Sequence, residues 1–431
     1  MTVDIRPLIG LPPNDTRRAF EARGALRTTM KWHEMWESEH ARYFTVAKLA
    51  RLDLLDDIRN SLADALANGG TVEQWKANLI PTLQRAGWWG RVQDRSLTGT
   101  DAAVNVGPRR LENIFRINMR VSRAAGQWAR IQDRKDVAPF LAYFALDDGH
   151  ARPQHALWGG LRPPTPRVIL RVDDPTWDWL FPPNDWGCRC WVVQLSQADL
   201  DRRGWKVTEP PSRGKLRRFW RAGSPTPELV PEGIGAGWAY NPGKASLRAI
   251  ADKAAATLGR FADADLAGAR ATLRDLVDAP SFLRTMDEPG ASFPVMLLDD
   301  ALRDALGAQT RVGVLSADTW AKQQLSHPEI GIPEYRRLPD LGAAPDLVFQ
   351  QDDQRLIFMR SADGRWLKAV VKVTADRGEL FVTSLHWASA RESERMHNRF
   401  PLIFGQIAGA LAALIAQDIA SERAEDVGQE A

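Results

Sequence analysis

The spacing of apolar residues predicts two consecutive helices early in the chain. The first has a single apolar face, formed by Leu55, Ile58, Leu62 and Leu66. These residues recur at intervals of three and four, as on one side of an α-helix. Asn68-Gly69-Gly70 would end this helix, and Thr71 with Gln74 forms a capping-box pattern that would start the next one.

A third and longer helix is predicted around residues 109–130. Its apolar side carries Leu111, Ile114, Ile117, Val121, Ala125 and Trp128. Arginines occupy the rest of its circumference, namely Arg109, Arg110, Arg116, Arg120, Arg123 and Arg130. These arginines either form a solvated face or contact an acidic partner surface or packaged DNA, and the pattern leaves both interpretations open.

After Thr310 the pattern changes from helical spacing to alternation. Arg311 to Leu315 predicts a strand, and a helix with Asp318 as its cap follows as far as Ser326. Three alternating apolar runs come next, at Arg355–Arg360, Trp366–Thr374 and Glu379–His386. The gaps between them contain Asp-Gly and Arg-Gly pairs, which are typical of hairpin turns. This region predicts a helix packed on an antiparallel meander.

The chain is therefore expected to be an α+β protein with several parts. A helical N-terminal region with an irregular Cys-Arg-Cys element covers residues 1–245, and a helical bridge covers 246–294. The small helix-plus-antiparallel-sheet domain covers 295–400, and an apolar helix with an acidic tail covers 401–431. Within the first part, the sequence between residues 209 and 227 is rich in Pro, Gly and Ser. This composition predicts a linker-like boundary and not a helix or strand.

The apolar stretch from Leu402 to Ala416 is shorter than the ~20 residues needed to cross a bilayer. We therefore expect a buried or partner-docking helix and no membrane anchor. The acidic end, Glu422 to Ala431, is expected to be frayed.

Composition narrows the class of protein. The hydrophobic share of 44% and the charged share of 26% are those of an ordinary globular protein. A net charge of +3 provides no global field for nucleic-acid binding, so any basic surface must be local. Two cysteines argue against a disulfide-built secreted protein. The 17 tryptophans are better explained by core and interface packing than by ligand binding.

The segment from Asp147 to Cys190 concentrates Gly, Pro, Trp and Asp together with both cysteines. This composition predicts an irregular element, because Pro and Gly disfavour a regular helix. His155, Cys188 and Cys190 are candidate ligands of a structural zinc ion, with His150 or Asp148 completing a tetrahedron. In the alternative, the cysteines are small buried hydrophobic groups, the histidines are ordinary polar groups, and no cofactor is required.

The order of residues in this segment resembles the Mu gene F-like minor head proteins of tailed phages, also called phage head morphogenesis proteins. The resemblance is carried by Asp148, Arg152, Pro153, His155, Gly159, Asp173, Asp174, Trp177, Pro182, Pro183, Asn184, Cys188, Arg189 and Cys190. A second segment, from Gly237 to Gly243, resembles one that follows the signature in such proteins. The resemblance implies a minor capsid component of the virion head, made in the host cytoplasm. Its partners would be the portal protein, other head proteins and packaged DNA.

Catalytic chemistry is a separate question, and it concerns residues 295–400. The candidate catalytic residues are His327, Arg360, Lys372, Ser384 and His386. Histidines with Lys, Arg and Ser on one sheet could support a metal-independent ribonuclease, in which one group removes a proton and another supplies one. The alternative is that the lysines are solvated and the histidines are scattered polar positions.

The same region also resembles phage-encoded nuclease-like domains grouped with the barnase, EndoU, colicin and RelE ribonucleases. The residues that carry this resemblance run through Leu315–Thr319, Lys322, Ser326–Ile330, Glu334-Tyr335 and Val382–His386. It implies RNA as a substrate. Two functions are therefore expected: a head component that also carries a nuclease-like module, or a toxin-like RNA-cleaving effector for which the N-terminal half is the carrier.

Overall fold

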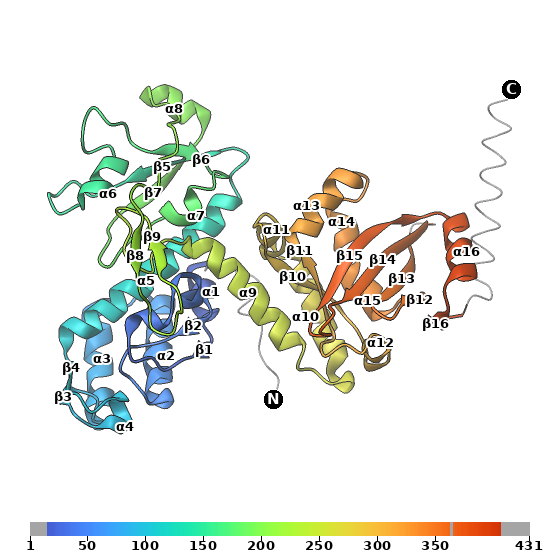
Figure 1. The fold of residues 1–431 in the computed structure, drawn as a ribbon, viewed down its shortest axis with the longest axis horizontal. Helices are drawn as coiled ribbons and strands as arrows, with labels where there is room; N and C mark the ends of the chain where they lie inside the picture. The colour runs from blue at the N-terminus through green and yellow to red at the C-terminus, as the bar shows by residue number, and fades with distance from the viewer. Residues whose placement is uncertain (1–14, 363–364, 407–431) are drawn as a thin grey trace. The chain divides into compact units, whose positions relative to one another are not determined.

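The computed structural model describes residues 15–362 and 365–406, and these form two compact units (Figure 1). The first unit extends to Ile250 and the second begins at Ala251. The division falls inside helix α9 (Pro242–Leu258).

The helices predicted for the first unit are confirmed. They are α2 (Leu52–Asn68), α3 (Val72–Arg85) and α5 (Pro108–Gln132). Gly69 ends α2 in the left-handed conformation, with φ of 68°, where a residue without Cβ is unstrained. The Thr71 hydroxyl accepts the Gln74 amide at 3.2 Å, and the Gln74 side chain accepts the Thr71 amide at 3.0 Å. The capping box predicted at the start of α3 is therefore present.

Helix α5 contributes to two hydrophobic cores of the first unit. Its first half, with Leu111 and Met119, packs in a core with α2 and α3. Its second half, with Val121 and Trp128, packs in a second core with the strands and loops after residue 139. The long helix thereby joins the helical part of the unit to the motif-bearing part.

Residues 139–195 contain a small antiparallel sheet in the order β6-β5-β7. Its strands are β5 (Phe140–Phe144), β6 (Ile169–Arg171) and β7 (Trp191–Leu195). Two short helices lie in the same stretch, α6 (Pro153–Trp158) and α7 (Trp177–Leu180).

The remaining elements of the first unit are short. They are α1 (Asp15–Glu21), β1 (Ala25–Leu26), η2 (Trp32–Glu34), η3 (Glu37–Ala41), β2 (Tyr43–Phe44), β3 (Gly90–Val92), α4 (Arg95–Thr98), β4 (Val104–Val106), α8 (Gln197–Arg203), β8 (Arg217–Phe219) and β9 (Glu228–Val230).

The Pro- and Gly-rich segment 209–227 does not coincide with the division between the two units. It contains strand β8, which pairs with β9 directly after it, and Phe219 of β8 stacks on Trp36 with ring centroids 5.4 Å apart. These residues therefore belong to the first unit, where the Pro and Gly residues shape loops around a short hairpin.

A seven-stranded sheet organises the second unit, in the order β10-β11-β15-β14-β13-β12-β16. Its strands are β10 (Ser292–Leu297), β11 (Val312–Ser316), β12 (Leu347–Asp352), β13 (Arg355–Ala362), β14 (Arg365–Val373), β15 (Leu380–Ala388) and β16 (Leu402–Phe404). All neighbours are antiparallel except β11 and β15, which are parallel. The predicted meander is confirmed as β13, β14 and β15, within a larger sheet than expected.

The helices of the second unit are η4 (Asp263–Asp265), α10 (Leu266–Asp278), α11 (Pro280–Met286), α12 (Asp300–Ala305), α13 (Ala317–Ser326), α14 (Ile332–Tyr335), α15 (Leu338–Ala343) and α16 (Ala390–Arg399). Helix α10, in the stretch predicted to be a bridge, packs on β10 and α15. The helix predicted to end at Ser326 is confirmed as α13. Its cap is Ser316 and not Asp318, because the Ser316 hydroxyl accepts the Thr319 amide at 3.1 Å.

The prediction of an apolar helix from Leu402 is wrong for its first residues. Leu402–Phe404 forms β16, which pairs with β12. An edge strand offers unpaired backbone groups, and this pairing satisfies them. The rest of the predicted helix and the acidic tail lie outside the described residues, apart from 405 and 406. Within the described part of the chain, no helix combines the length and the apolar character that crossing a membrane requires.

Candidate functional site

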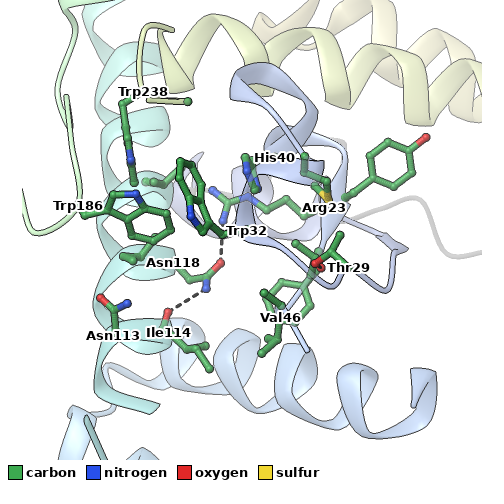
Figure 2. Close-up of a pocket in the computed structure, with 18 of the residues that line it drawn as sticks. Arg23, Thr29, Trp32, His40, Val46, Asn113, Ile114, Asn118, Trp186 and Trp238 are labelled. Atoms are coloured by element: carbon green, nitrogen blue, oxygen red, sulfur yellow. Dashed lines mark hydrogen bonds between the residues drawn. The ribbon is translucent and has the colours of Figure 1, made fainter. Parts of the chain in front are cut away.

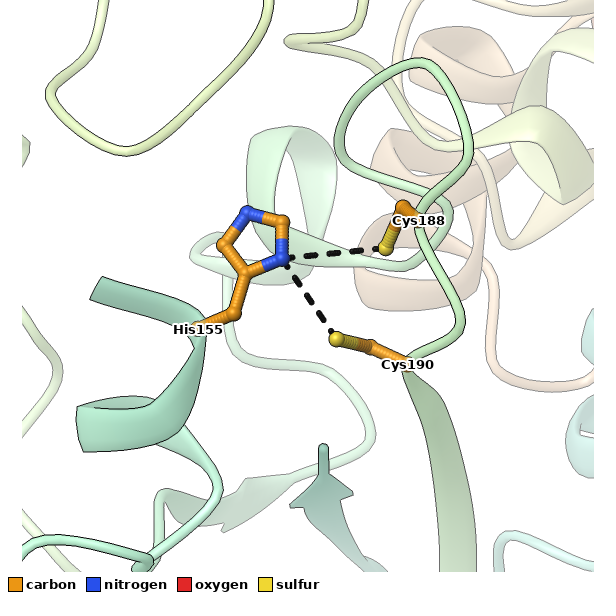
Figure 3. Close-up of side chains that lie close together, drawn as sticks. All are labelled: His155, Cys188 and Cys190. Carbon is orange, nitrogen blue, oxygen red and sulfur yellow. Dashed lines mark hydrogen bonds between the residues drawn. The ribbon is translucent and has the colours of Figure 1, made fainter. Parts of the chain in front are cut away.

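The histidine and the two cysteines of the motif segment lie together in the first unit (Figure 3). His155 is on α6, and the cysteines are on the loop that leads into β7. The Nδ1 atom of His155 is 3.8 Å from Cys188 Sγ and 3.5 Å from Cys190 Sγ. His155 and Cys188 are each only 2% exposed, so water has little access to them. This arrangement presents one nitrogen and two sulfur atoms to a common point.

The orientation of the His155 ring is fixed from its other side. Its Nε2 lies 2.9 Å from the Gly233 carbonyl oxygen. A carbonyl can only accept, so Nε2 carries a proton, and in the neutral ring Nδ1 then presents a lone pair to the thiols. A Cβ on Gly233, whose φ is +80°, would lie 2.4 Å from Cγ of Gln154. Glycine therefore permits the close approach on which the ring orientation depends.

The two thiols share one interaction. The hydrogen bond between them lowers the pKa of Cys188 and raises the pKa of Cys190. The cause is that one thiolate is stabilised by the neighbouring S–H, whereas a second negative charge at that distance is disfavoured.

Charged residues of the same segment tie its loops to one another. Arg189 makes two hydrogen bonds to the Asp148 carboxylate, one of them at 2.9 Å. Arg152 pairs with Asp185 at 2.9 Å and also donates to the Trp186 carbonyl oxygen at 2.8 Å. Because these bonds join the loop after β5 to the loop before β7, we call the set of bonded residues the motif knot: Asp148, Arg152, His155, Asn184, Asp185, Cys188, Arg189 and Cys190.

Asn184 is the fully buried member of the knot, and it hydrogen-bonds to residues of the interior. Its side-chain oxygen accepts the Tyr143 hydroxyl at 2.9 Å, and its amide nitrogen donates to the Leu180 carbonyl oxygen at 2.9 Å. Trp177 is also fully buried, and its indole N–H donates to the Arg171 carbonyl oxygen at 2.9 Å. These bonds satisfy polar groups that would otherwise be costly to bury.

Two other motif residues have local roles in the backbone. Asp174 accepts the Thr176 amide at 2.8 Å at the start of α7. Pro183 is buried and follows a cis peptide bond from Pro182. Asp174 and Pro183 therefore each have an identifiable place in this segment.

Neither Asp148 nor His150 joins the histidine and the cysteines. Asp148 is occupied by Arg189, and His150 is exposed. Among the described residues, the group that could hold a metal ion here consists of His155, Cys188 and Cys190. Sequence reasoning missed Tyr143 and Gly233, since neither lies in the signature and only the fold brings them to it.

Arginines of α5 line a cavity beside the knot. The cavity has a volume of about 730 Å³, and its lining includes Arg120, Arg123, Arg130, Arg134 and Cys190. Arg130 lies 4.0 Å from Asp15, which partly offsets the positive charge. Both interpretations of these arginines, a solvated face and a contact with an acidic partner or DNA, stay predictions.

A second cavity of the first unit has a volume of about 310 Å³ and is rich in aromatic side chains (Figure 2). Trp186 makes edge contacts with Trp32 and Trp238, with centroids 5.6 Å and 5.3 Å away. On the opposite side, burial and the nearby Arg23 charge lower the pKa of His40 to about 4. The tryptophans at this cavity pack against one another.

In the second unit, two of the predicted catalytic histidines lie together. The rings of His327 and His386 are nearly parallel, with centroids 5.5 Å apart and an angle of 11°. His327 Nδ1 is 3.0 Å from Glu329 Oε1, and His386 Nε2 is 3.4 Å from Glu392 Oε1. Each imidazole therefore has its own carboxylate. We call these four residues, with Lys368 and Ser384, the histidine cluster.

Lys368 and Ser384 complete the surroundings of His386. Lys368 Nζ is 2.8 Å from the same Glu392 oxygen, and Ser384 Oγ is 3.2 Å from His386 Nδ1. Burial and the Lys368 charge lower the pKa of His386. Although burial alone would raise it, the pKa of Glu392 is lowered because Lys368 and His386 stabilise its carboxylate.

The structure separates the other two predicted catalytic residues from the histidine cluster. Arg360 pairs with Leu367, one position out of register with Lys368, so it points to the opposite face of the sheet. Its guanidinium donates to the carbonyl oxygens of Asp340 and Ala344. Lys372 is on the Lys368 face but four residues further along β14, a distance of about 13 Å. Glu392, which reaches the cluster from α16, was missed.

The sequence of the first unit identifies the class of protein that this chain resembles. Residues 56–193, from within α2 to within β7, match the family described as Phage Mu protein F like protein. This stretch contains the whole motif knot, and the match ends before the second unit.

Two curated relatives make the similarity more specific. The chain is 33% identical over 262 residues to the "Putative capsid assembly protein F" of Escherichia phage Mu, with 57% of each chain covered. It is 34% identical over 234 residues to the "Mu-like prophage FluMu F protein" of Haemophilus influenzae, covering 51% of this chain and 54% of the relative. The chain thus spans about half the length of these relatives. No solved structure matches it.

Proposed function

We propose that this chain is a minor head protein of a Mu-like phage or prophage, which acts in head morphogenesis near the portal. The observation that carries this proposal is the similarity of residues 56–193 to the Mu F-like family. The motif residues add support, because they bond to one another and leave no obvious reactive centre on the surface. A segment whose side chains hydrogen-bond mainly to one another is better suited to a structural protein than to an enzyme.

Purified particles of the parent phage provide the test. We expect mass spectrometry to find the protein at low copy number in the virion, and we expect deletion of its gene to leave defective heads. Co-purification of the portal protein with the tagged chain would support the portal as partner. Infectious heads of normal shape formed without the protein would contradict the proposal.

We further propose that the second unit cleaves RNA, and the histidine cluster is the observation that favours this function. Two imidazoles with separate carboxylates can divide the work of a general base and a general acid. The base takes the proton of a ribose 2′-hydroxyl, whose oxygen then forms a bond to phosphorus. The acid protonates the 5′-oxygen as its bond to phosphorus breaks, and Lys368 offsets the charge on the phosphoryl oxygens.

This activity is tested on the full chain with RNA of mixed sequence, in the presence of a chelator. We expect cleavage that leaves 2′,3′-cyclic ends and that falls at least about 100-fold in His327→Ala or His386→Ala, as for loss of a general acid or base. His150→Ala is the matched control, because that exposed histidine lies in the first unit. Full activity in both cluster variants, or no cleavage of any RNA, would remove the proposal. If the activity is confirmed and toxic to the host, the first unit would act as its carrier.

A further inference from the structure

The motif knot contains a set of ligand atoms that the proposed role in head assembly does not use. The His155 nitrogen and the two cysteine sulfurs all lie within 4.8 Å of one another. Zinc binds imidazole nitrogen at about 2.05 Å and thiolate sulfur at about 2.3 Å, so a tetrahedral ion holds these atoms about 3.5 Å apart. The observed separations from Nδ1 are 3.5 Å and 3.8 Å. The two nitrogen–sulfur separations are therefore already close to the spacing that a zinc ion imposes.

The hydrogen bond behind His155 is the second feature that points to a metal. A histidine that binds a metal through one nitrogen usually donates its other N–H to a carbonyl or carboxylate, which fixes the tautomer and the ring plane. The Gly233 carbonyl oxygen accepts Nε2–H at 2.9 Å and so leaves the Nδ1 lone pair facing the thiols. The ring also stacks on Trp158, with centroids 5.4 Å apart, which restricts its rotation.

The ligand chemistry selects the kind of ion. Two thiols and one imidazole suit a soft or borderline cation and disfavour Mg²⁺ and Ca²⁺, which require oxygen ligands. Both cysteines are free, and a disulfide between residues this close in sequence rarely attains its required geometry.

We propose that His155, Cys188 and Cys190 bind a zinc ion. The fourth position of the tetrahedron would be filled by water or by a group from a partner, since Cys190 lines the arginine-rich cavity beside the knot. The ion would join α6 directly to the loop before β7, in addition to the hydrogen bonds of the knot. Its role is to hold these two segments together, whether or not the chain assembles into heads.

Elemental analysis of the full-length protein, purified without chelators, tests the proposal. We expect one zinc per chain in the wild type, and loss of most of it in Cys188→Ser and Cys190→Ser. His150→Ala is the control and should keep its zinc, because His150 lies in the same segment but is exposed. Full zinc content in either serine variant would overturn the proposed ligand set.

A measurement on the unaltered protein guards against variants that fail to fold. Wild-type protein stripped of metal and titrated with Co²⁺ should show the visible absorption of a tetrahedral thiolate site, which Zn²⁺ then abolishes. Removing the metal should also lower the melting temperature of the first unit, and added zinc should restore it. Wild-type protein that contains no zinc and shows no such cobalt spectrum would refute the proposal.

Discussion

The motif knot of the first unit and the histidine cluster of the second unit both combine histidines with partner groups, but they differ in access to solvent. His155 is buried, its Nδ1 faces the two cysteines of the knot, and its Nε2 faces the Gly233 carbonyl oxygen. The side chains of His327 and Glu329 are 39% and 55% exposed, respectively. A buried histidine with every direction occupied can position neighbouring groups or bind an ion. An exposed pair can meet a substrate.

This comparison assigns different consequences to substitutions in the two regions. Changes in the knot should mainly affect stability, because they leave buried groups unpaired or create cavities. Changes in the cluster should mainly affect chemistry and leave folding nearly intact.

The largest loss of stability is expected for Trp177→Ala. This side chain is fully buried beside the knot, so its removal leaves a cavity and removes the indole hydrogen bond to the Arg171 carbonyl oxygen. We expect the free energy of unfolding of the first unit to fall by about 3–5 kcal/mol. Trp220→Ala is the matched control, because Trp220 is 64% exposed, and its effect should stay within about 0.5 kcal/mol.

Urea unfolding followed by tryptophan fluorescence provides the measurement, since most of the 17 tryptophans lie before residue 251. If both substitutions lowered the free energy of unfolding equally, the stability of the first unit would not depend on the buried Trp177 side chain.

A pH effect of intermediate size is expected from His40. Its folded-state pKa of about 4 lies below the ordinary value of 6.5, so the folded unit favours the neutral ring. The resulting stability is present above pH 6.5 and is lost as the pH falls toward 4, because the unfolded chain takes up the proton first. Between pH 7 and pH 5 the loss should be about 2 kcal/mol.

His40→Gln should remove this component of the pH dependence, measured by urea unfolding at the two pH values. His150→Gln, at an exposed position, should leave the dependence as in the wild type. A His40→Gln protein with the same loss of stability at pH 5 would assign that loss to other groups.

The smallest effect is expected at the rim of the knot. The side chains of Asp148 and Arg189 are 31% and 39% exposed, so water and salt screen their attraction. Asp148→Asn should lower the free energy of unfolding far less than Trp177→Ala does, and this loss should shrink at high ionic strength. A loss comparable to that of Trp177→Ala would show that the charged rim, and not the buried interior, carries the stability of the knot.

Sequence patterns could predict those elements that depend on local spacing. Helices α2, α3 and α5 follow from apolar periodicity and caps, and strands β13 to β15 follow from alternation and turns. The proximity of His155 to the cysteines was also expected, because they share one compact, irregular segment.

The remaining features depend on contacts that local patterns do not encode. The position of Arg360 on the face opposite His386 is set by the register between strands, and a shift of one residue would have reversed it. Glu392 reaches His386 from a helix, and Gly233 reaches His155 from 78 residues away. Strand β10 after its first residue and the first three residues of β12 are buried on both faces, so these strands lack a clear alternation and were missed.

The most direct test of the division of labour compares two alleles in the parent phage. One carries Asn184→Ala, which removes the hydrogen bond between the knot and the Tyr143 hydroxyl, and the other carries both His327→Ala and His386→Ala. Electron microscopy of the lysates would count complete and defective heads. We predict defective heads for the knot allele and wild-type numbers of complete heads for the histidine allele. Normal heads from the knot allele, or equally defective heads from both, would contradict this account.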